Sequence, residues 1–151
     1  MAANSNSEAF RAAVVDGRAH NVFYRIDQLT RLHARLVKDP QSIIRAIAAY
    51  SEVHHDEAQF EFVSVAETLK KQIGMLDPKK ELEDEYLPAH GRDHGLRRVP
   101  VGAVVIIPSP HTPLYSTMAP LSSAIAAGNC AVIQVSMTIE DNDNGDSRCS
   151  S

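Results

Sequence analysis

The fold is decided by three neighbouring stretches: VGAVVII at residues 101–107, LYSTMAPLSSAIAA at residues 114–127 and AVI at residues 131–133. The first stretch is short and rich in β-branched residues, which predicts a buried strand. The second is rich in Ala and Leu and is followed by Gly128-Asn129, a typical helix stop. Residues 109–113, SPHTP, must form a loop between them. Residues 100–134 therefore predict one β-α-β unit of a parallel sheet.

Charged side chains avoid this unit. No Asp, Glu, Lys or Arg occurs from Val99 through Ile139, although the chain has 15 basic and 19 acidic residues. Parallel strands are covered on both faces, so the lack of charge indicates burial. Two strands do not make a sheet, and a unit this apolar requires further strands and helices. The prolines within it, among them Pro108 and Pro120, argue against a membrane-spanning helix.

Helical patterns precede the unit. Ser7 can cap a short helix that stops at Gly17. A second helix carries one apolar stripe, formed by Val22, Ile26, Leu29 and Leu36. Asp39-Pro40 ends that helix and starts a third, and apolar residues at steps of three and four predict a fourth over residues 56–76. Residues 78–99 mix charges with Pro and Gly, which predicts a linker or an irregular hairpin.

Composition excludes several classes of protein. A length of 151 residues with 44% hydrophobic residues allows one ordinary domain with a real core. A net charge of −4 and a pI near 5.9 argue against a nucleic-acid partner, because phosphate binding requires a basic face. Two cysteines are too few for a disulfide scaffold, and the N-terminus lacks the pattern of a secretory signal. A cytoplasmic protein without a membrane span is expected.

Familiar site motifs are absent or incomplete. The chain contains no G-x-G-x-x-G, no G-x-x-x-x-G-K and no G-x-S-x-G. No thiol or second carboxylate motif completes a tetrahedral metal set, so surface histidines and no metal site are predicted for His54-His55 and for His90 and His94. The acidic run 140–145 is similar to a calcium loop, but Ser151 stands where a bidentate Glu belongs, which favours a solvated tail.

A specific resemblance rests on the same stretches. VGAVVII at 101–107, Pro113-Leu114, Pro120-Leu121 and AIAAGNCAVI at 124–133 are similar to the first nucleotide-binding β-α-β unit of the aldehyde dehydrogenase superfamily. YRIDQL at 24–29 matches the R-x-x-Q-L stretch of that family's N-terminal helical region. The resemblance covers residues 8–134 and is closest to the shorter class that acts on fatty aldehydes. It implies an α/β fold in which N-terminal helices precede one β-α-β unit of an incomplete Rossmann-like parallel sheet, so that residues 1–134 form a partial NAD-binding domain.

The resemblance also implies site residues. Enzymes of the family attack an aldehyde with a cysteine thiolate, pass hydride to NAD(P)⁺ and hydrolyse the thioester with water activated by a Glu. An Asn after the first strand holds the oxyanion there, and His111 occupies this position here. Cofactor contacts fall on Ile107, Pro108 and Ser109 and on Gln134, which replaces a Lys that contacts the adenosine ribose. The nucleophile and the Glu base belong to later sequence, so no catalytic residue is assigned.

Cys130 is interpreted as a structural residue. It occupies the Gly-Asn-Cys position at the start of the second strand, and no base is placed to activate it. Free cysteine is among the most buried residue types, so a small core residue is expected.

The resemblance ends at Gln134, and residues 135–151 are expected to form an acidic disordered tail. Gln134-Val135-Ser136 is what CAG-GTAAGT encodes, the commonest form of a eukaryotic exon end followed by an intron start. We therefore hypothesise that residues 135–151 are translated intron, or the product of a shifted gene model or of a truncating mutation.

Three interpretations of function follow. The first is a truncated aldehyde dehydrogenase relative, a pseudoenzyme that does not oxidise aldehydes alone because it lacks the nucleophile. The second is a non-catalytic interaction module whose apolar surface docks on a second copy, giving a homo-oligomer, or on a full-length relative. The third is a vestigial product whose role comes from its gene context, such as a biosynthetic pathway of secondary metabolism with an aldehyde intermediate.

Overall fold

The computed structural model describes residues 2–91 and 99–134, and it confirms an α/β fold in which helices precede a small parallel sheet. The predicted tail 135–151, with its calcium-loop-like run and Cys149, and His94 lie outside the described residues. The elements in chain order are α1 (Ala2–Asp16), η1 (Arg18–His20), α2 (Val22–Leu36), α3 (Pro40–Ser51), α4 (His55–Met75), α5 (Pro78–Tyr86), η2 (Pro88–His90), β1 (Ala103–Ile106), α6 (Pro113–Ala126) and β2 (Cys130–Ile133).

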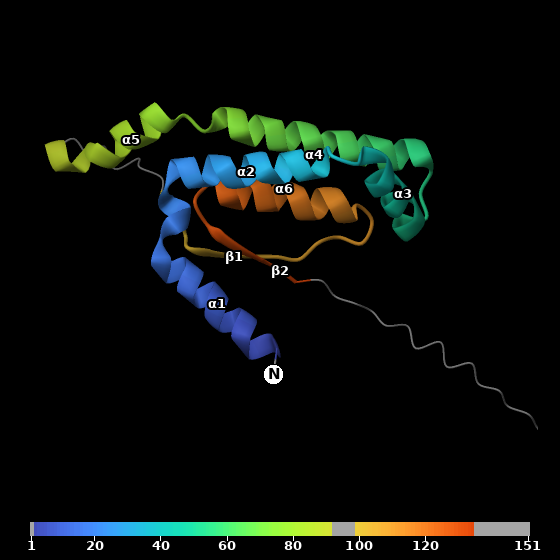
Figure 1. Ribbon diagram of the computed structural model, residues 1–151, viewed down its shortest axis with the longest axis horizontal. Coiled ribbons are helices and arrows are strands. Elements are labelled where there is room, and N and C mark those ends of the chain that lie inside the picture. The colour runs from blue at the N-terminus through green and yellow to red at the C-terminus, as the bar shows by residue number, and fades with distance from the viewer. Residues whose placement is uncertain (1, 92–98, 135–151) are drawn as a thin grey trace, which may run out of the picture.

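The core lies where α2, α4 and α6 pack side by side, with α3 across one end (Figure 1). Its fully buried members come from the predicted apolar stripes of α2 and α4, because a helix buries the residues that recur every three or four positions. They are Leu29, Ala58, Val65 and Leu69, and the partly buried side chains of Leu114, Met118 and Ile125 on α6 pack against the same cluster.

Capping side chains explain where several helices begin. The Asn21 side chain accepts a hydrogen bond from the Phe23 N–H at 2.9 Å, and that of Asp39 accepts one from the Ser42 N–H at 3.2 Å, as Asp-Pro predicts. Gly17 adopts a positive φ of 67°, which confirms the predicted stop of the first helix. The prediction that Ser7 caps this helix is wrong, because α1 already begins at Ala2.

The interpretation of residues 78–99 as a linker or irregular hairpin is wrong for its first half. Residues Pro78–Tyr86 form the helix α5, and the Asp77 side chain caps it by accepting from the Lys79 N–H at 3.0 Å. Asp77-Pro78 therefore both ends α4 and starts the next helix, as Asp39-Pro40 does earlier in the chain. The 3₁₀ turn η2 follows, and residues 92–98 lie outside the described residues.

The sheet has the predicted parallel pairing. Ala103 lies opposite Cys130 and Ile106 opposite Ile133, and α6 connects the two strands. The turn into β2 is fixed by two groups. Gly128 has a φ of 80°, and the Asn129 side-chain oxygen accepts a hydrogen bond from the Gly102 N–H at 2.9 Å. The helix stop predicted from Gly128-Asn129 is thereby confirmed.

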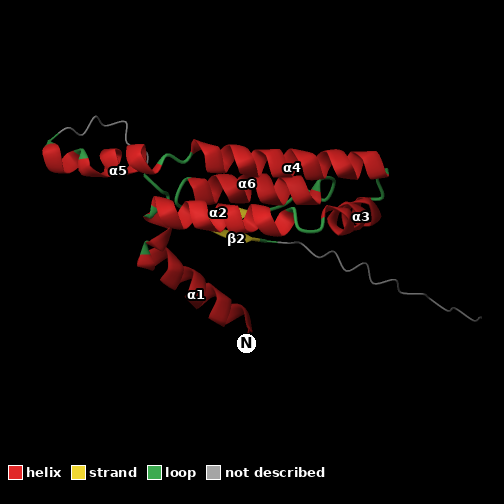
Figure 2. Ribbon diagram, turned by 45° about the horizontal axis from the view of Figure 1, so that its top comes forward, coloured by secondary structure: helices red, strands yellow, loops and turns green. Residues whose placement is uncertain are grey.

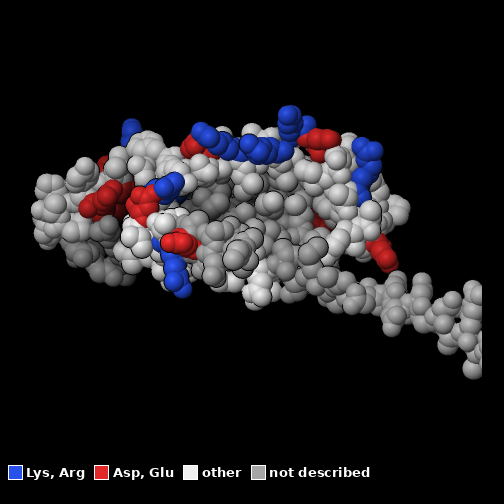
Figure 3. All heavy atoms as spheres, turned by 60° about the horizontal axis from the view of Figure 1, so that its bottom comes forward, with Lys and Arg blue, Asp and Glu red and all other residues white. Residues whose placement is uncertain are grey.

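Within residues 2–91 and 99–134, one face of the sheet is left largely open at β1, contrary to the expectation that both faces are covered. Figure 2 shows the strands at one margin of the helical layer. On β1, Ile106 is buried, whereas the exposed fractions are 61% for Val105 and 68% for the following Ile107. The described residues thus leave apolar strand surface open to solvent. In Figure 3 the charged side chains gather along one long edge and toward the ends of the molecule.

No helix in the described ranges combines the length and the hydropathy that a bilayer span requires.

Candidate functional site at the carboxyl edge of the sheet

The structure brings the four sequence-predicted cofactor positions to one edge of the sheet. Parallel strands end at the same edge of a sheet. The Gln134 N–H donates to the Ile106 carbonyl at 2.9 Å, so Gln134, the first residue after β2, lies beside Ile107, the first residue after β1. Pro108 and Ser109 continue from there as a half-buried connection toward α6. Ligands of open α/β sheets bind outside the carboxyl ends of the strands, and these residues lie at that place.

The loop between β1 and α6 is held by a pair of serines. Ser116, on the first turn of α6, accepts a hydrogen bond from the Ser109 N–H at 3.0 Å and donates to the Ser109 carbonyl at 3.2 Å. The Ser109 hydroxyl in turn accepts from the His111 N–H at 3.4 Å. The backbone of the loop is therefore fixed, while the side chain of His111 is exposed and accessible to a ligand.

The start of α6 is capped from another helix. Thr112, at the N-cap position, makes no side-chain cap hydrogen bond, and Pro113 has no N–H. The Oε1 atom of Glu61 on α4 accepts from the Tyr115 N–H at 2.8 Å, and the Ser116 N–H donates to the Thr112 carbonyl at 2.9 Å. This helix terminus is therefore occupied by a protein carboxylate, so it is a poor place for a phosphate group.

A second buried charge holds the opposite end of α6. The Arg25 guanidinium, whose side chain is 7% exposed, donates from Nη1 to the Ala126 carbonyl at 2.6 Å. From Nη2 it donates to Glu81 Oε2 at 2.7 Å and to the His20 carbonyl at 3.4 Å. A cation near the carbonyl end of a helix is favourable, and here one side chain links η1, α2, α5 and α6.

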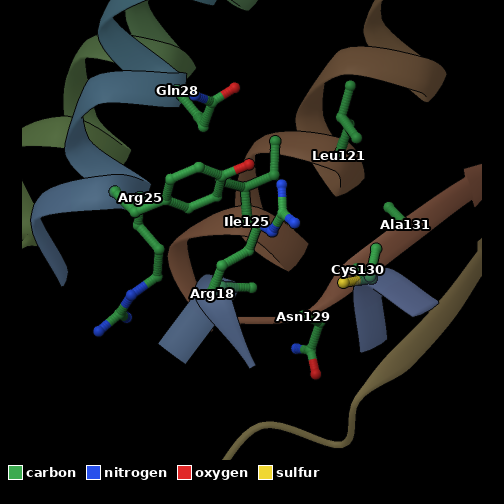
Figure 4. Close-up of a pocket in the computed structure, with 11 residues that line it drawn as sticks. Arg18, Arg25, Gln28, Leu121, Ile125, Asn129, Cys130 and Ala131 are labelled. Atoms are coloured by element: carbon green, nitrogen blue, oxygen red, sulfur yellow. The ribbon is translucent and has the colours of Figure 1, made fainter. Parts of the chain in front are cut away.

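Cys130 lies at the opposite edge of the sheet from the His111 loop, since it is the first residue of β2. It is half-buried and lines a cavity of about 190 Å³ between α1, η1, α2, α6 and β2 (Figure 4). Arg18 lines the same cavity, and its hydrogen bond with Asp16 raises the pKa of this guanidinium. Leu121 and Ile125 also lie in its wall, and its other ionisable side chains are those of Tyr24 and Arg25.

The histidines and acidic groups do not gather into a metal site. His54 is exposed and accepts a hydrogen bond from the Asp56 N–H at 3.4 Å, and His55 and His90 are exposed as well. Within residues 2–91 and 99–134, no three His, Cys, Asp or Glu side chains are placed to hold a metal ion.

Two residues of this arrangement, Arg25 and Glu61, are not predicted by the sequence patterns. We expected Arg25 away from the apolar stripe of its helix, yet it is buried, and the predicted stripe of α4 does not include Glu61. In both cases the spacing along the helix could have indicated a buried position. Arg25 is three residues after Val22, and Glu61 is three residues after Ala58, so each lies in register with buried positions.

The helices, the parallel β-α-β unit and its loop define a class of protein: an α/β protein in which N-terminal helices precede a small parallel sheet. The sequence profile described as "Aldehyde dehydrogenase family" matches residues 2–139. The chain belongs to this family. The match ends at residue 139, beyond the predicted end of the resemblance at Gln134.

Curated relatives agree with this assignment. The chain is 26% identical over 133 residues to "Aldehyde dehydrogenase family 3 comG" of Dictyostelium discoideum, covering 86% of this chain and 28% of the relative. It is 31% identical over 134 residues to "Aldehyde dehydrogenase family 3 member B1" of Homo sapiens, covering 85% and 27%. With "Aldehyde dehydrogenase family 3 member A2" of Mus musculus it shares 29% identity over 139 residues, covering 87% and 28%.

The matched region spans slightly more than a quarter of the length of these relatives. A comparison with solved structures gave no significant match.

Proposed function

We propose that this chain is the first part of the nucleotide-binding domain of an aldehyde-oxidising, NAD(P)⁺-dependent enzyme, and that the 151-residue chain by itself does not oxidise aldehydes. One observation carries the proposal: Gln134 and the loop with His111 share the carboxyl edge of the sheet, whereas Cys130 lies at the other edge. The cofactor and oxyanion positions expected from the family therefore lie close together, and no cysteine of residues 2–91 and 99–134 lies beside them.

The residues at this edge fit only part of a dinucleotide. Gln134 is exposed, and its side-chain amide can donate to and accept from the hydroxyl groups of a ribose. It offers no charge for a 2′-phosphate. A pyrophosphate does not fit the start of α6, because the Glu61 carboxylate already binds the Tyr115 N–H there. When bound, the nicotinamide would supply the acceptor for a hydride.

His111 is the residue through which this unit would act on an aldehyde. Its exposed ring can donate a hydrogen bond to an oxygen on which negative charge develops, the role that an Asn has at this position in the family. Attack on the aldehyde also requires a thiolate and a base. Cys130 is not placed for this attack, because it lies at the start of β2, at the other edge of the sheet from the His111 loop.

The proposal is tested by mixing the full chain with NAD⁺ or NADP⁺ and straight-chain fatty aldehydes and following the absorbance of reduced nicotinamide. We expect no reduction above that of the buffer, with a catalytically active family member as the positive control. Turnover at a dehydrogenase-like rate of about 1 s⁻¹ or more, abolished in Cys130→Ala, would show that the proposal is wrong.

A second candidate function, an interaction module, is favoured by the open sheet face. Val101 is 85% exposed and Val105 61% exposed, and large exposed apolar patches mark interaction sites. In this function the face docks on a second copy of the chain or on a full-length relative.

Docking through this face predicts that Val105→Lys lowers the apparent molecular mass measured by size-exclusion chromatography with light scattering. A lysine ammonium buried in the interface without a partner would destabilise the complex by more than the loss of the valine contact alone. The matched control is Tyr50→Lys on α3, where the exposed fraction of the tyrosine is 67%. A folded chain that is monomeric before substitution, and that remains so when a full-length relative is added, would contradict the docking function.

A further inference from the structure

Glu61 is a charged residue on the buried face of α4. Its exposed fraction is 9%, and its neighbours along the helix include Ala58 and Val65, which are completely buried. A carboxylate in such surroundings is destabilising unless hydrogen-bond donors replace the water it has lost. The position of Glu61 therefore requires a specific partner.

The partner is the start of α6. Glu61 Oε1 accepts from the Tyr115 N–H at 2.8 Å, and Tyr115 is the third residue of that helix. The first turn of α6 contains no acidic residue, and the N-cap residue Thr112 makes no side-chain cap hydrogen bond. The carboxylate that would normally stand at the N-cap of the same helix is thus supplied by a residue 54 positions away.

The cap adjoins the loop that carries His111. Only Thr112 lies between His111 and the first residue of α6, and Ser116 in the capped turn holds the loop backbone at Ser109. The direction in which α6 begins therefore determines where the loop runs after β1. We infer that Glu61 is a positioning residue: by capping α6 from α4, it sets the position of His111 at the carboxyl edge of the sheet.

The link to aldehyde chemistry rests on the proposed function, but the structural effect does not require it. The test uses amide hydrogen exchange at Tyr115 and the NMR resonances of His111 in the full chain, with no activity readout. A catalytically active chain would contradict the proposed function and leave this inference standing.

Substitution Glu61→Leu is expected to increase the exchange rate of the Tyr115 amide by about tenfold, as loss of a helix cap does, and to shift the His111 resonances. The matched control is Glu67→Leu, also on α4, whose carboxylate is exposed and pairs with Lys70. We expect this control to leave both signals unchanged. Equal signals in the two variants would overturn the inference, even if Glu61→Leu lowers the overall stability.

Two further variants separate positioning from general stability. In the Glu61→Leu background, Thr112→Asp restores a cap within the helix itself, and we expect it to return the Tyr115 exchange rate and the His111 resonances toward their original values. Failure of this rescue would contradict the inference.

If Glu61→Leu does not fold, Glu61→Gln takes its place in the exchange measurement, since it keeps an acceptor oxygen and loses the charge. Tyr115 exchange should then rise a few-fold relative to Glu67→Gln, and no rise overturns the inference.

Discussion

Replacing Arg25 by leucine is expected to lower the free energy of unfolding by about 2–4 kcal/mol, because hydrogen bonds from a buried charged group exceed ordinary ones in strength. The substitution removes the donor at 2.6 Å from the Ala126 carbonyl at the end of α6. It also removes the ion pair with Glu81, but this side chain is 46% exposed and regains water. The main loss is therefore at the backbone carbonyls. Urea denaturation followed by circular dichroism measures the change.

Two variants control for the loss of charge and of side-chain volume. Arg31→Leu lies on the same helix, where an Arg that is 72% exposed pairs with Asp27 at 2.9 Å, and we expect a change within about 0.5 kcal/mol. Arg25→Lys keeps the charge but cannot reproduce the guanidinium fork, so an intermediate loss is expected. Equal stabilities of Arg25→Leu and Arg31→Leu would refute the assigned role of Arg25.

The substitution Gly128→Ala is expected to destabilise the chain by about 2–4 kcal/mol, through backbone strain and overpacking together. Gly128 has a φ of 80°, which a residue with a Cβ rarely adopts. An added Cβ would lie 2.9 Å from Pro100 Cγ and 3.2 Å from the Ala19 carbonyl oxygen. The backbone of η1 and the entry to β1 would both have to move. Thermal unfolding and the urea midpoint report the loss.

The matched control is Gly74→Ala, near the end of α4. Nothing lies within 4 Å of a Cβ built at this glycine, and alanine is the better helix former. This variant is therefore expected to be more stable by about 0.5–1 kcal/mol. A result in which both alanine variants behave alike would mean that the turn before β2 does not require glycine.

Local patterns predicted most of the elements. The apolar stripes of α2 and α4 could be predicted because buried residues repeat every three or four positions along a helix. Asp39-Pro40 marks both the end of one helix and the cap of the next. The same signal at Asp77-Pro78 could have predicted α5. Most of its residues are charged and none is buried, so no apolar periodicity marked the helix.

The location of the candidate site could be predicted from the sequence, but the residues that hold its loop and helix in place could not. Ile107 and Gln134 could be assigned to one edge because the parallel strands of a β-α-β unit end together. The exposure of Val105 and Ile107 was not expected, since an apolar strand alone does not show which of its faces the same chain covers.

The sequence by itself determined the β-α-β unit and most helix boundaries, because these depend on neighbouring residues and on periodicity, and the resemblance of its motifs to known proteins indicated the family. Only the tertiary structure decided the roles of Arg25 and Glu61. Their partners are 101 and 54 positions away, at the two ends of α6. The free energy of a buried charge depends on the donors or acceptors that packing brings to it, and no pattern within one helix contains that information.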